Sequence, residues 1–597
     1  MDRPNSRTGW IPPLALCTGV GLLVCSVADA LSRATLGVSP LIYWAGILIL
    51  AVPTFYRLTS EDASPRERLV LACMLGLALY GVKVMRDAPI FTFSDELIHG
   101  FNVHQIAASH HLFHSNPTLP ATPHYPGLEG ATSALTSLTG LSSFVAGVLL
   151  VGAARLVLAA SLFLLFQRVS RSARVAGLGV AIYAGNFNFL FWGAQFSYES
   201  LALPLLLLVM MGLAEREAAP PTALKAWGAP VVLGMAAIVV THHLTSYAMA
   251  GVLVALSLAY WHVRRSWRPA NPWLFAVLGI ALAAFWLVAV ASSTVGYLSP
   301  VLTDAVKAVG NTIAGEKPPR GLFQGGSSTA GTTPLAARAI ALLAVAMLAA
   351  GLPFGLWQVR RHLRKQPFAI VFALAAIGFF ATLALRLAPA AWESGNRASE
   401  FLFVGLAFVL ACAAFEALRR WPRSRMSRPL VAGGLALVLV GGAIAGWPWD
   451  SQLARPLRIS SHGQEIVSPP LGMAEWARDQ IPRGRLAATT ADAGLLLTPG
   501  GVTAISGNSP DVEDLLAEEH LSGWELPLLR RNRLRYVVAD QREVSSDSLR
   551  GYYFSEQGSR NAQLMPKSVI AKFNRVPGAT RLYTNGTITV FDLGAQR

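Results

Sequence analysis

Two adjacent carboxylates and a nearby histidine stand directly after an apolar run of the chain. Asp95 and Glu96, with His99 three residues further on, open the polar segment that follows residues 69–86. A carboxylate held against a hydroxyl can take up its proton while the hydroxyl attacks, which is general-base catalysis. Asp95 and Glu96 are therefore the candidate catalytic residues. A second interpretation remains open, because acidic residues at the start of a helix also satisfy free backbone N–H groups.

Polar side chains also occur at the ends of other apolar runs. Charged groups at membrane depth are costly, and they are functional candidates for that reason. We expect a set of them to converge on one outward-facing cavity, because each lies near the same predicted face of the membrane. The candidate substrate-binding residues are His99, Tyr125, Glu129, Gln195, Tyr198, Glu199, His242, His243, Glu393 and Arg397. The adjacent pair His242 and His243 would point to different faces of a helix, so we expect at most one of them to line the cavity.

Metal and cofactor chemistry has weaker support in the sequence. Six histidines lie between His99 and His124, but no H-E-x-x-H or comparable zinc spacing occurs among them. One acidic pair together with Glu199 leaves a divalent cation possible and does not decide the matter. No other cofactor is predicted. The four cysteines lie inside apolar runs without metal spacing, and we interpret them as packing residues.

The composition indicates what must hold these side chains. Of the 597 residues 53% are hydrophobic and only 14% are charged, whereas soluble domains carry about 25% charged residues. The sequence therefore predicts a mainly α-helical, polytopic membrane protein. Thirteen apolar runs are long enough to cross a bilayer: 11–31, 38–56, 69–86, 143–167, 175–192, 197–214, 227–241, 246–263, 272–292, 335–358, 367–386, 398–418 and 429–447.

Basic residues predict the orientation of these runs. Lysine and arginine cluster in every second connection, the pattern of cytoplasmic loops. The N-terminus is then inside, and everything after Asp450 is outside. The net charge of +16 resides in short loops and not on one soluble face, which argues against nucleic acid as a partner.

The predicted organisation has two parts. Residues 1–449 form a transmembrane catalytic domain with a long outer loop at 87–142, in which apolar spacing from Leu97 to Ala108 predicts a helix along the membrane surface. A second outer loop at 292–334 is rich in Gly, Ser, Thr and Pro, so we expect it to be flexible, either as a plain mobile loop or as a substrate lid. Residues 450–597 form a small α/β domain, with a helix at 473–481, strands at 486–490, 503–506 and 535–539, and a hairpin at 581–592 whose Asn585-Gly586 suits a type I′ turn.

These motifs together resemble the GT-C superfamily of polyprenyl-phosphate-dependent membrane glycosyltransferases, which includes protein O-mannosyltransferases, aminoarabinose transferases and oligosaccharyltransferases. Asp95-Glu96 followed by His99 is similar to the Asp-Glu-x-His of protein mannosyltransferases, with one extra residue before the histidine. Four further stretches are similar to a bacterial branch of the superfamily: YPGLE (125–129), AQFSYESLALPL (194–205), THHLTS (241–246) and GNRASEFLFVGL (395–406).

The resemblance implies a membrane enzyme that transfers a sugar with inversion. The donor would be a sugar on a polyprenyl phosphate, and the acceptor a protein, lipid or glycan that arrives from outside. Asp95 would be the base, Arg397 would bind the leaving phosphate bidentately, and one histidine of the 242–243 pair would assist.

Two other classes of protein compete with this interpretation. A surface-polysaccharide polymerase or ligase also uses polyprenyl-linked donors, but we expect it to depend on arginines and histidine in large outer loops. A transporter or flippase would show an internal repeat and polar groups near the midplane, and the sequence shows neither.

Overall fold

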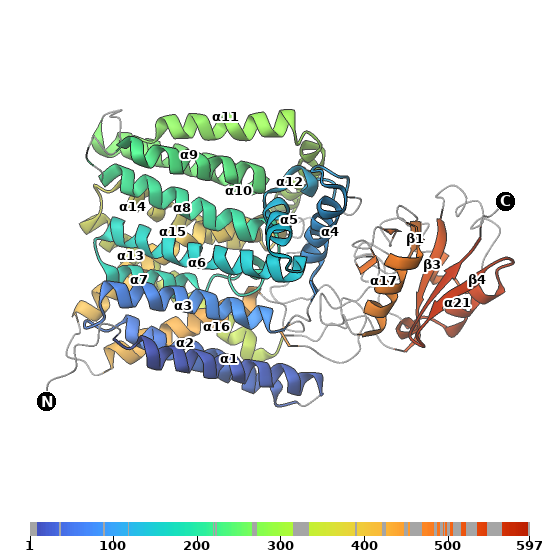
Figure 1. Ribbon diagram of the computed structural model, residues 1–597. Helices are drawn as coiled ribbons and strands as arrows, with labels where there is room; N and C mark the ends of the chain where they lie inside the picture. Colours follow the sequence, from blue (N-terminus) through green and yellow to red (C-terminus); the bar gives the residue numbers. More distant parts are fainter. Residues whose placement is uncertain are drawn as a thin grey trace.

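The computed structural model places a bundle of long helices next to a smaller α/β region (Figure 1). It describes residues 9–34, 37–86, 90–116, 119–218, 220, 224–265, 271–314, 333–388, 391–420 and 426–446 of the helical part. In the C-terminal part it describes residues 452–453, 468–482, 486–489, 494, 496–497, 502–505, 515–520, 534–545 and 564–594.

The helical part is that of a polytopic membrane protein. Nine helices within the described ranges are long and apolar enough to cross a membrane: α1 (Ile11–Arg33), α2 (Ser39–Leu58), α6 (Ser143–Ser170), α8 (Tyr198–Ala218), α10 (His243–Arg264), α13 (Leu335–His362), α14 (Pro367–Leu385), α15 (Trp392–Arg420) and α16 (Ser427–Gly446). Three other apolar helices are shorter: α7 (Ala173–Tyr183), α9 (Leu224–Thr241) and α11 (Trp273–Ala289). Only helices satisfy every backbone polar group within a single segment in lipid, so apolar sequences of this length form them.

Each of the thirteen predicted runs contains a helix, but they do not all match a full span. The helix α3 (Pro65–Val84) is long enough and carries four charged residues, Arg66, Glu67, Arg68 and Lys83. The run at 175–192 was predicted as one span, and this is wrong: α7 ends at Tyr183, and turns with a short 3₁₀ segment follow to Ser197. Eleven residues of helix rise only about 16 Å. The count of thirteen crossings stays a prediction.

Close backbone contact explains why the chain leaves the helix after Tyr183. A Cβ atom at Gly446 of α16 would overlap the carbonyl oxygen of Phe187, and one at Gly442 would overlap that of Gly185. The Trp192 indole also donates a hydrogen bond to the Gly446 carbonyl at 2.8 Å. These glycines allow α16 to lie directly on the irregular segment 184–197, which leads into α8.

Three helices lie outside the main bundle, at the end nearest the C-terminal region (Figure 1). The first long loop contains α4 (Ser94–Ser109) and α5 (Gly127–Thr139), so the helix predicted there is confirmed. The second long loop was expected to be flexible, but its first half forms α12 (Ser293–Ile313), which is amphipathic. The helical spacing of apolar residues in this half stabilises a helix despite its glycines and serines. The glycine-rich stretch 315–332 lies outside the described residues.

Basic connections meet at the opposite end of the bundle, which we call the basic end. Arg174 at the start of α7 bonds to Glu61 at 3.0 Å and also to the Thr59 carbonyl between α2 and α3. Arg428 at the start of α16 reaches the Thr59 hydroxyl at 3.3 Å. The grouping of basic clusters that the sequence predicted is therefore present in space, while the side of the membrane on which they lie stays a prediction.

The C-terminal region contains a mixed sheet with helices on its two faces. Among the described residues its strands are β1 (Leu486–Ala488), β2 (Thr503–Ile505), β3 (Leu534–Asp540), β4 (Thr580–Thr584) and β5 (Ile588–Asp592), in the order β2-β1-β3-β5-β4. The first three pair in parallel, and β5 runs antiparallel to β3 and β4. The helix α17 (Ser468–Gln480) covers one face, and α21 (Lys567–Ala571) covers the other.

The predicted helix, strands and hairpin of this region are confirmed to within a few residues. The type I′ turn is wrong: Gly586 has a positive φ of 84° but Asn585 does not, and type I′ needs positive φ at both positions. The Asn585 side chain instead accepts hydrogen bonds from the Thr587 and Ile588 amides at 3.1 and 2.8 Å. The boundary at 449/450 stays a prediction.

The C-terminal region packs directly against the first outer loop. Leu471 and Ala474 of α17, together with Leu496, join an apolar cluster with Leu97 of α4 and Phe91 just before it. Part of the surface of α4 is therefore covered by residues almost 400 positions further along the chain.

Candidate functional site

The N-termini of several helices converge at the end that carries α4 and α5. The helices α4, α8, α10 and α15 begin with residues 94, 198, 243 and 392, and all four contribute side chains to one polar cluster. Each helix start presents free N–H groups and the positive end of a helix dipole. Together they favour negative charge at this place, from side chains or from a bound anion.

Arg397 lies at the centre of the cluster, on the second turn of α15. One guanidinium nitrogen, Nη1, donates a hydrogen bond to the carboxylate of Glu199 on the first turn of α8. The other, Nη2, lies 3.9 Å from Asp95 and 3.7 Å from Glu393. Asp95, Glu199, Glu393 and Arg397 therefore form one ion cluster.

The two nitrogens of Arg397 differ in what they are free to bind. The bond of Nη1 to Glu199, whose side chain is only 6% exposed, fixes the plane of the guanidinium. The distances from Nη2 are too long for hydrogen bonds, and no other hydrogen bond of Nη2 occurs among the described residues. Nη2 is therefore the donor available to a ligand oxygen. Asp95 is 31% exposed beside it and can be reached by a substrate.

Aromatic and histidine rings form a wall next to this ion cluster. Tyr198 stacks on His242 with ring centroids 4.2 Å apart, and its ring also meets His243 at 5.8 Å and His99 at 4.5 Å. Tyr125 lies on the far side of His243, with centroids 5.2 Å apart. Burial raises the pKa of the Tyr125 hydroxyl above its usual range, so this group stays protonated at neutral pH.

Both histidines of the 242–243 pair contact Tyr198, while the expectation that at most one of them lines the site stays a prediction. His242 is the residue before α10 and has an extended backbone, with φ −155° and ψ 124°, so it does not follow the helical spacing. Both rings can therefore reach Tyr198. The His242 Nδ1 lies 2.8 Å from the Thr245 hydroxyl, while its Nε2 has no hydrogen-bond partner among the described residues although the side chain is fully buried.

A buried hydrogen-bond network holds one ring of this wall, His99, in position. His99 Nδ1 lies 2.6 Å from Glu129 Oε1, which also accepts a hydrogen bond from the Asn102 amide at 3.1 Å. Asn102 in turn bonds to Thr122 and Asn116 at 3.1 and 2.9 Å. These residues tie α4 to α5 and hold the ring of His99 against Tyr198. The structure therefore places His99 and Glu129 behind the site surface, as supports.

Glu96 occupies a different environment from its neighbour Asp95. It is almost fully buried and forms an ion pair with Lys83 at the end of α3. Its oxygens also accept hydrogen bonds from the amides of Phe196 at 2.9 Å, and of Thr92 and Phe93 at 3.3 Å. The capping interpretation therefore describes Glu96, whereas Asp95 remains accessible.

Further buried polar side chains lie next to the ion cluster, deeper in the helical bundle. Glu400, one turn below Arg397, has its carboxyl next to that of Glu199. A Cβ at Gly193 would lie 3.0 Å from Glu400 and 3.2 Å from Arg155 of α6, so both side chains pack tightly against this glycine. The Arg155 guanidinium donates to the Phe189 carbonyl at 2.8 Å. Gln195 is also buried in this segment, and its amide nitrogen has no partner among the described residues.

Lys83 and Arg155 are residues that were not among the sequence candidates. Each is a basic side chain inside an apolar run, which is itself a signal of function or of a buried ion pair. The partner of Lys83 could not be read from the sequence, because 13 residues separate it from Glu96.

No group of three or more His, Cys, Asp or Glu side chains with the geometry of a metal site occurs within the described part of the chain. The carboxylates of the cluster instead face the guanidinium of Arg397.

Comparisons with known proteins give a likeness in fold. No protein-family model matches the sequence, and no curated protein matches it. Among solved structures the chain is similar to ArnT from Cupriavidus metallidurans bound to undecaprenyl phosphate, with a TM-score of 0.48 and 13% identity over 88% of this chain and 98% of that one. The apo state of ArnT matches equally, over 97% of its chain. At this TM-score the similarity concerns the course of the chain and assigns no activity to it.

Proposed function

We propose that the protein is an inverting membrane glycosyltransferase that moves a sugar from a polyprenyl-phosphate donor to an acceptor hydroxyl at the outer face of a bacterial cytoplasmic membrane. The observation that carries this proposal is an accessible carboxylate, Asp95, beside an arginine that keeps one free face, at a place where four helix N-termini converge. Base and anion-binding group are adjacent, which is what transfer from a phosphodiester requires.

In the proposed reaction, Asp95 takes up the proton and Arg397 binds the leaving group. The acceptor oxygen attacks the anomeric carbon and gives its proton to the Asp95 carboxylate, while the bond between that carbon and the phosphate oxygen breaks. The polyprenyl phosphate leaves as an anion, and Nη2 of Arg397 donates hydrogen bonds to it. Attack opposite the leaving group inverts the anomeric centre, as in enzymes that direct a carboxylate at a water.

The other site residues have supporting roles in this proposal. Glu199 orients Arg397, and Glu393 lies at the exposed rim of the cluster with a side chain that is 59% exposed. Tyr198 is the least buried ring of the wall, and we assign its ring face to the sugar. The buried rings of His242, His243 and Tyr125 hold it in place. Glu96 is proposed as a positioning residue that fixes the start of α4, and with it Asp95.

Measured sugar transfer tests the proposal. The full chain, purified in lipid nanodiscs, is given a panel of polyprenyl-phosphate-linked sugars, and loss of the donor is followed by mass spectrometry. Asp95→Asn should lower the transfer rate by roughly 10²–10⁴, the usual contribution of a general base, because Asn caps a helix about as well as Asp and cannot accept the proton. Asp304→Asn, at an exposed position of α12, is the matched control and should remain active. An Asp95→Asn variant as active as the parent would falsify the assignment.

A further inference from the structure

Four consecutive basic side chains lie at the basic end of the bundle, where α13 leads into α14. Arg360 and Arg361 belong to the last turn of α13, and Arg364 and Lys365 follow in the short connection before Pro367. All four side chains are exposed. We call these four residues the basic strip.

The basic strip differs from the other connections at this end in its lack of acidic partners. Elsewhere at the basic end the described residues form ion pairs, which are Arg57–Glu67, Arg168–Glu215, Arg174–Glu61, Arg264–Glu217, and Glu416 with Arg419 and Arg420. Within the described part of the chain no carboxylate pairs with any residue of the basic strip. Its positive charges are therefore available to an anion from outside the protein.

The sequence beside this end contains no surplus of acid that could neutralise the basic strip. Residues 1–8, which precede α1, contain one acidic residue, Asp2, together with Arg3 and Arg7. Residues 421–425, which connect α15 to α16, contain Arg423 and Arg425 and no acidic residue. The segments outside the described residues therefore add to the positive excess and do not remove it.

Two aromatic rings of α13 hold arginines next to the basic strip. Phe354 and Trp357 are stacked, with ring centroids 5.8 Å apart. The guanidinium of Arg361 lies 5.2 Å from the centre of the Trp357 ring, and that of Arg420, from the end of α15, lies 5.4 Å from the centres of both rings. Such cation–π contacts orient a guanidinium by its face, so its N–H groups can still donate to oxygens at the edge. Trp357 thus joins cations from two helices.

The surroundings of the basic strip are those of a membrane interface. The helix α13 has 28 residues, so it rises about 42 Å and extends beyond a hydrocarbon core of about 30 Å. Its charged last turn marks the end that reaches the lipid headgroups. Trp357 is 43% exposed there, which is typical of an interfacial aromatic residue. Leu430 on the first turn of α16, a helix that packs against α13, is 66% exposed and offers further apolar surface.

We propose that the basic strip, together with Trp357, binds the headgroup of an anionic phospholipid from the leaflet at the basic end. The arginines and Lys365 neutralise the phosphate and donate hydrogen bonds to its oxygens, while the ring of Trp357 and the side chain of Leu430 contact the start of an acyl chain. A free phosphate would meet the same cations but would leave this apolar surface in water, so the surface favours a lipid. The proposal is independent of the proposed transferase activity.

Lipid titration of charge variants tests the proposal. The full chain is delipidated in detergent and titrated with phosphatidylglycerol or phosphatidylcholine of equal chain length, and bound lipid is counted by native mass spectrometry. The parent should prefer phosphatidylglycerol by about ten- to hundredfold, because each basic residue near an anionic headgroup strengthens binding by about fivefold. Arg360→Gln with Arg364→Gln should weaken phosphatidylglycerol by about five- to thirtyfold and leave phosphatidylcholine unchanged. Trp357→Leu keeps every charge and should weaken phosphatidylglycerol by about two- to fivefold, because it releases two guanidinium groups.

The matched control is Arg66→Gln with Arg171→Asn, which removes two exposed charges from other connections of the basic end. Asn suits position 171, where φ is 57°. This control should keep the affinity of the parent for phosphatidylglycerol. An equal loss in the control and in the strip variant would show that net charge governs binding, and it would overturn the proposal. Equal binding of the two lipids by the parent would overturn it as well. Displacement of phosphatidylglycerol by an equal concentration of soluble glycerol phosphate would also overturn it and assign the basic strip to a soluble anion.

Discussion

The cluster around Arg397 and the buried pair of Lys83 and Glu96 are two charged regions that meet at the start of α4. Three carboxylates surround one arginine in the first, and two of them are partly exposed, whereas one lysine faces one carboxylate in the second and both side chains are buried. Accessible carboxylates near an oriented arginine suit proton uptake during a reaction. A buried pair of equal and opposite charges suits a fixed structure, because neither charge is left uncompensated. The comparison teaches that the burial of two neighbouring carboxylates decides which of them can act in chemistry.

The start of α4 joins the two regions, because Asp95 belongs to the first and the next residue, Glu96, is bound to Lys83 in the second. Phe93 packs against the same lysine, with Lys83 Nζ 5.1 Å from its ring centre. The position of Asp95 therefore depends on the buried ion pair.

Removal of that pair should have the largest effect on stability. Lys83→Met leaves Glu96 buried and uncompensated, which should cost about 3–5 kcal/mol of unfolding free energy and lower the thermal midpoint measured in detergent. Lys83→Met combined with Glu96→Gln should recover most of the loss, since Gln keeps an acceptor for the Phe196 amide. Lys307→Met on the exposed side of α12 controls for the loss of a lysine. If the double variant were as unstable as the single one, the unpaired charge of Glu96 would not be the cause of the lost stability.

Removal of the central arginine should have the next largest effect. Arg397→Gln loses a charge-assisted hydrogen bond worth about 1.5–3 kcal/mol, so binding of the donor should weaken by roughly 10- to 100-fold in a titration with labelled donor. The double change Arg397→Gln with Glu199→Gln should restore stability without restoring donor affinity, because it removes the buried unpaired carboxylate. Full donor affinity in that variant would mean that Nη2 does not bind the donor.

An ion pair remote from both regions supplies a baseline for the value of a partly exposed pair. In the sheet, Arg535 binds Asp592 through two hydrogen bonds of 2.8 and 2.7 Å, and the Arg535 hydrogen bond lowers the pKa of the Asp592 carboxyl. The stabilisation is then present above the unfolded pKa of about 3.9 and is lost as the pH falls through the lower folded value. Asp592→Asn should cost at most about 1 kcal/mol at pH 7 and should differ little from the parent near pH 2, by hydrogen exchange of β5. An equal loss at both pH values would contradict the electrostatic origin.

The rim of the acidic cluster should give the smallest effect. Glu393→Gln removes one exposed negative charge beside Arg397, worth about 0.2–1 kcal/mol, and should therefore tighten donor binding by about 1.5- to fivefold. Increasing salt should erase the difference. Weaker donor binding in this variant would show that Glu393 contacts the donor directly and would remove the charge argument for the cluster.

The sequence determined the helical membrane architecture, the alternation of basic connections and most strands of the C-terminal sheet. These follow from local length, apolarity and periodicity, which a chain carries without its tertiary contacts. The sequence also identified the polar residues that gather around Arg397, because charge inside apolar sequence is costly wherever it folds.

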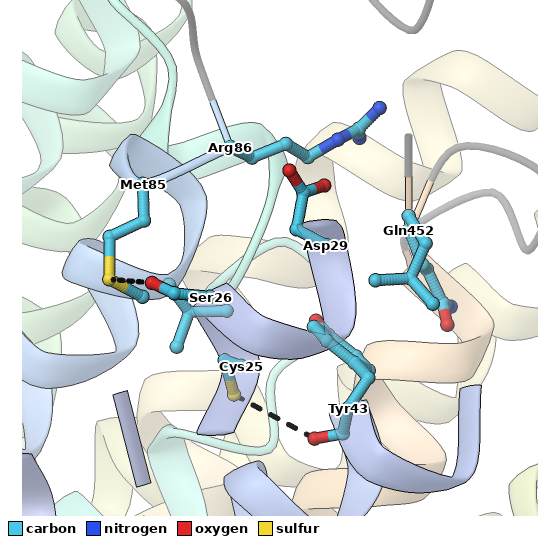
Figure 2. A pocket seen from close by; sticks show the side chains of 9 residues that line it. Cys25, Ser26, Asp29, Tyr43, Met85, Arg86 and Gln452 are labelled. Carbon is cyan, nitrogen blue, oxygen red and sulfur yellow. Dashed lines mark hydrogen bonds between the residues drawn. The ribbon is translucent and has the colours of Figure 1, made fainter. Parts of the chain in front are cut away.

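Only the tertiary structure decided how neighbouring residues differ. Asp95 and Glu96 are adjacent carboxylates that the sequence does not distinguish. In the structure Asp95 is accessible, whereas Glu96 is bound to Lys83. His242 and His243 both reach Tyr198 because the first lies outside the helix that contains the second. The pocket lined by Asp29, Tyr43 and Arg86 (Figure 2) also includes Gln452 and Leu453, which follow α16. Such contacts depend on which backbone segments approach one another, as α16 approaches residues 185–187 through its glycines. The spacing of apolar residues along the chain predicts single helices and strands, and it does not predict which of them will be in contact.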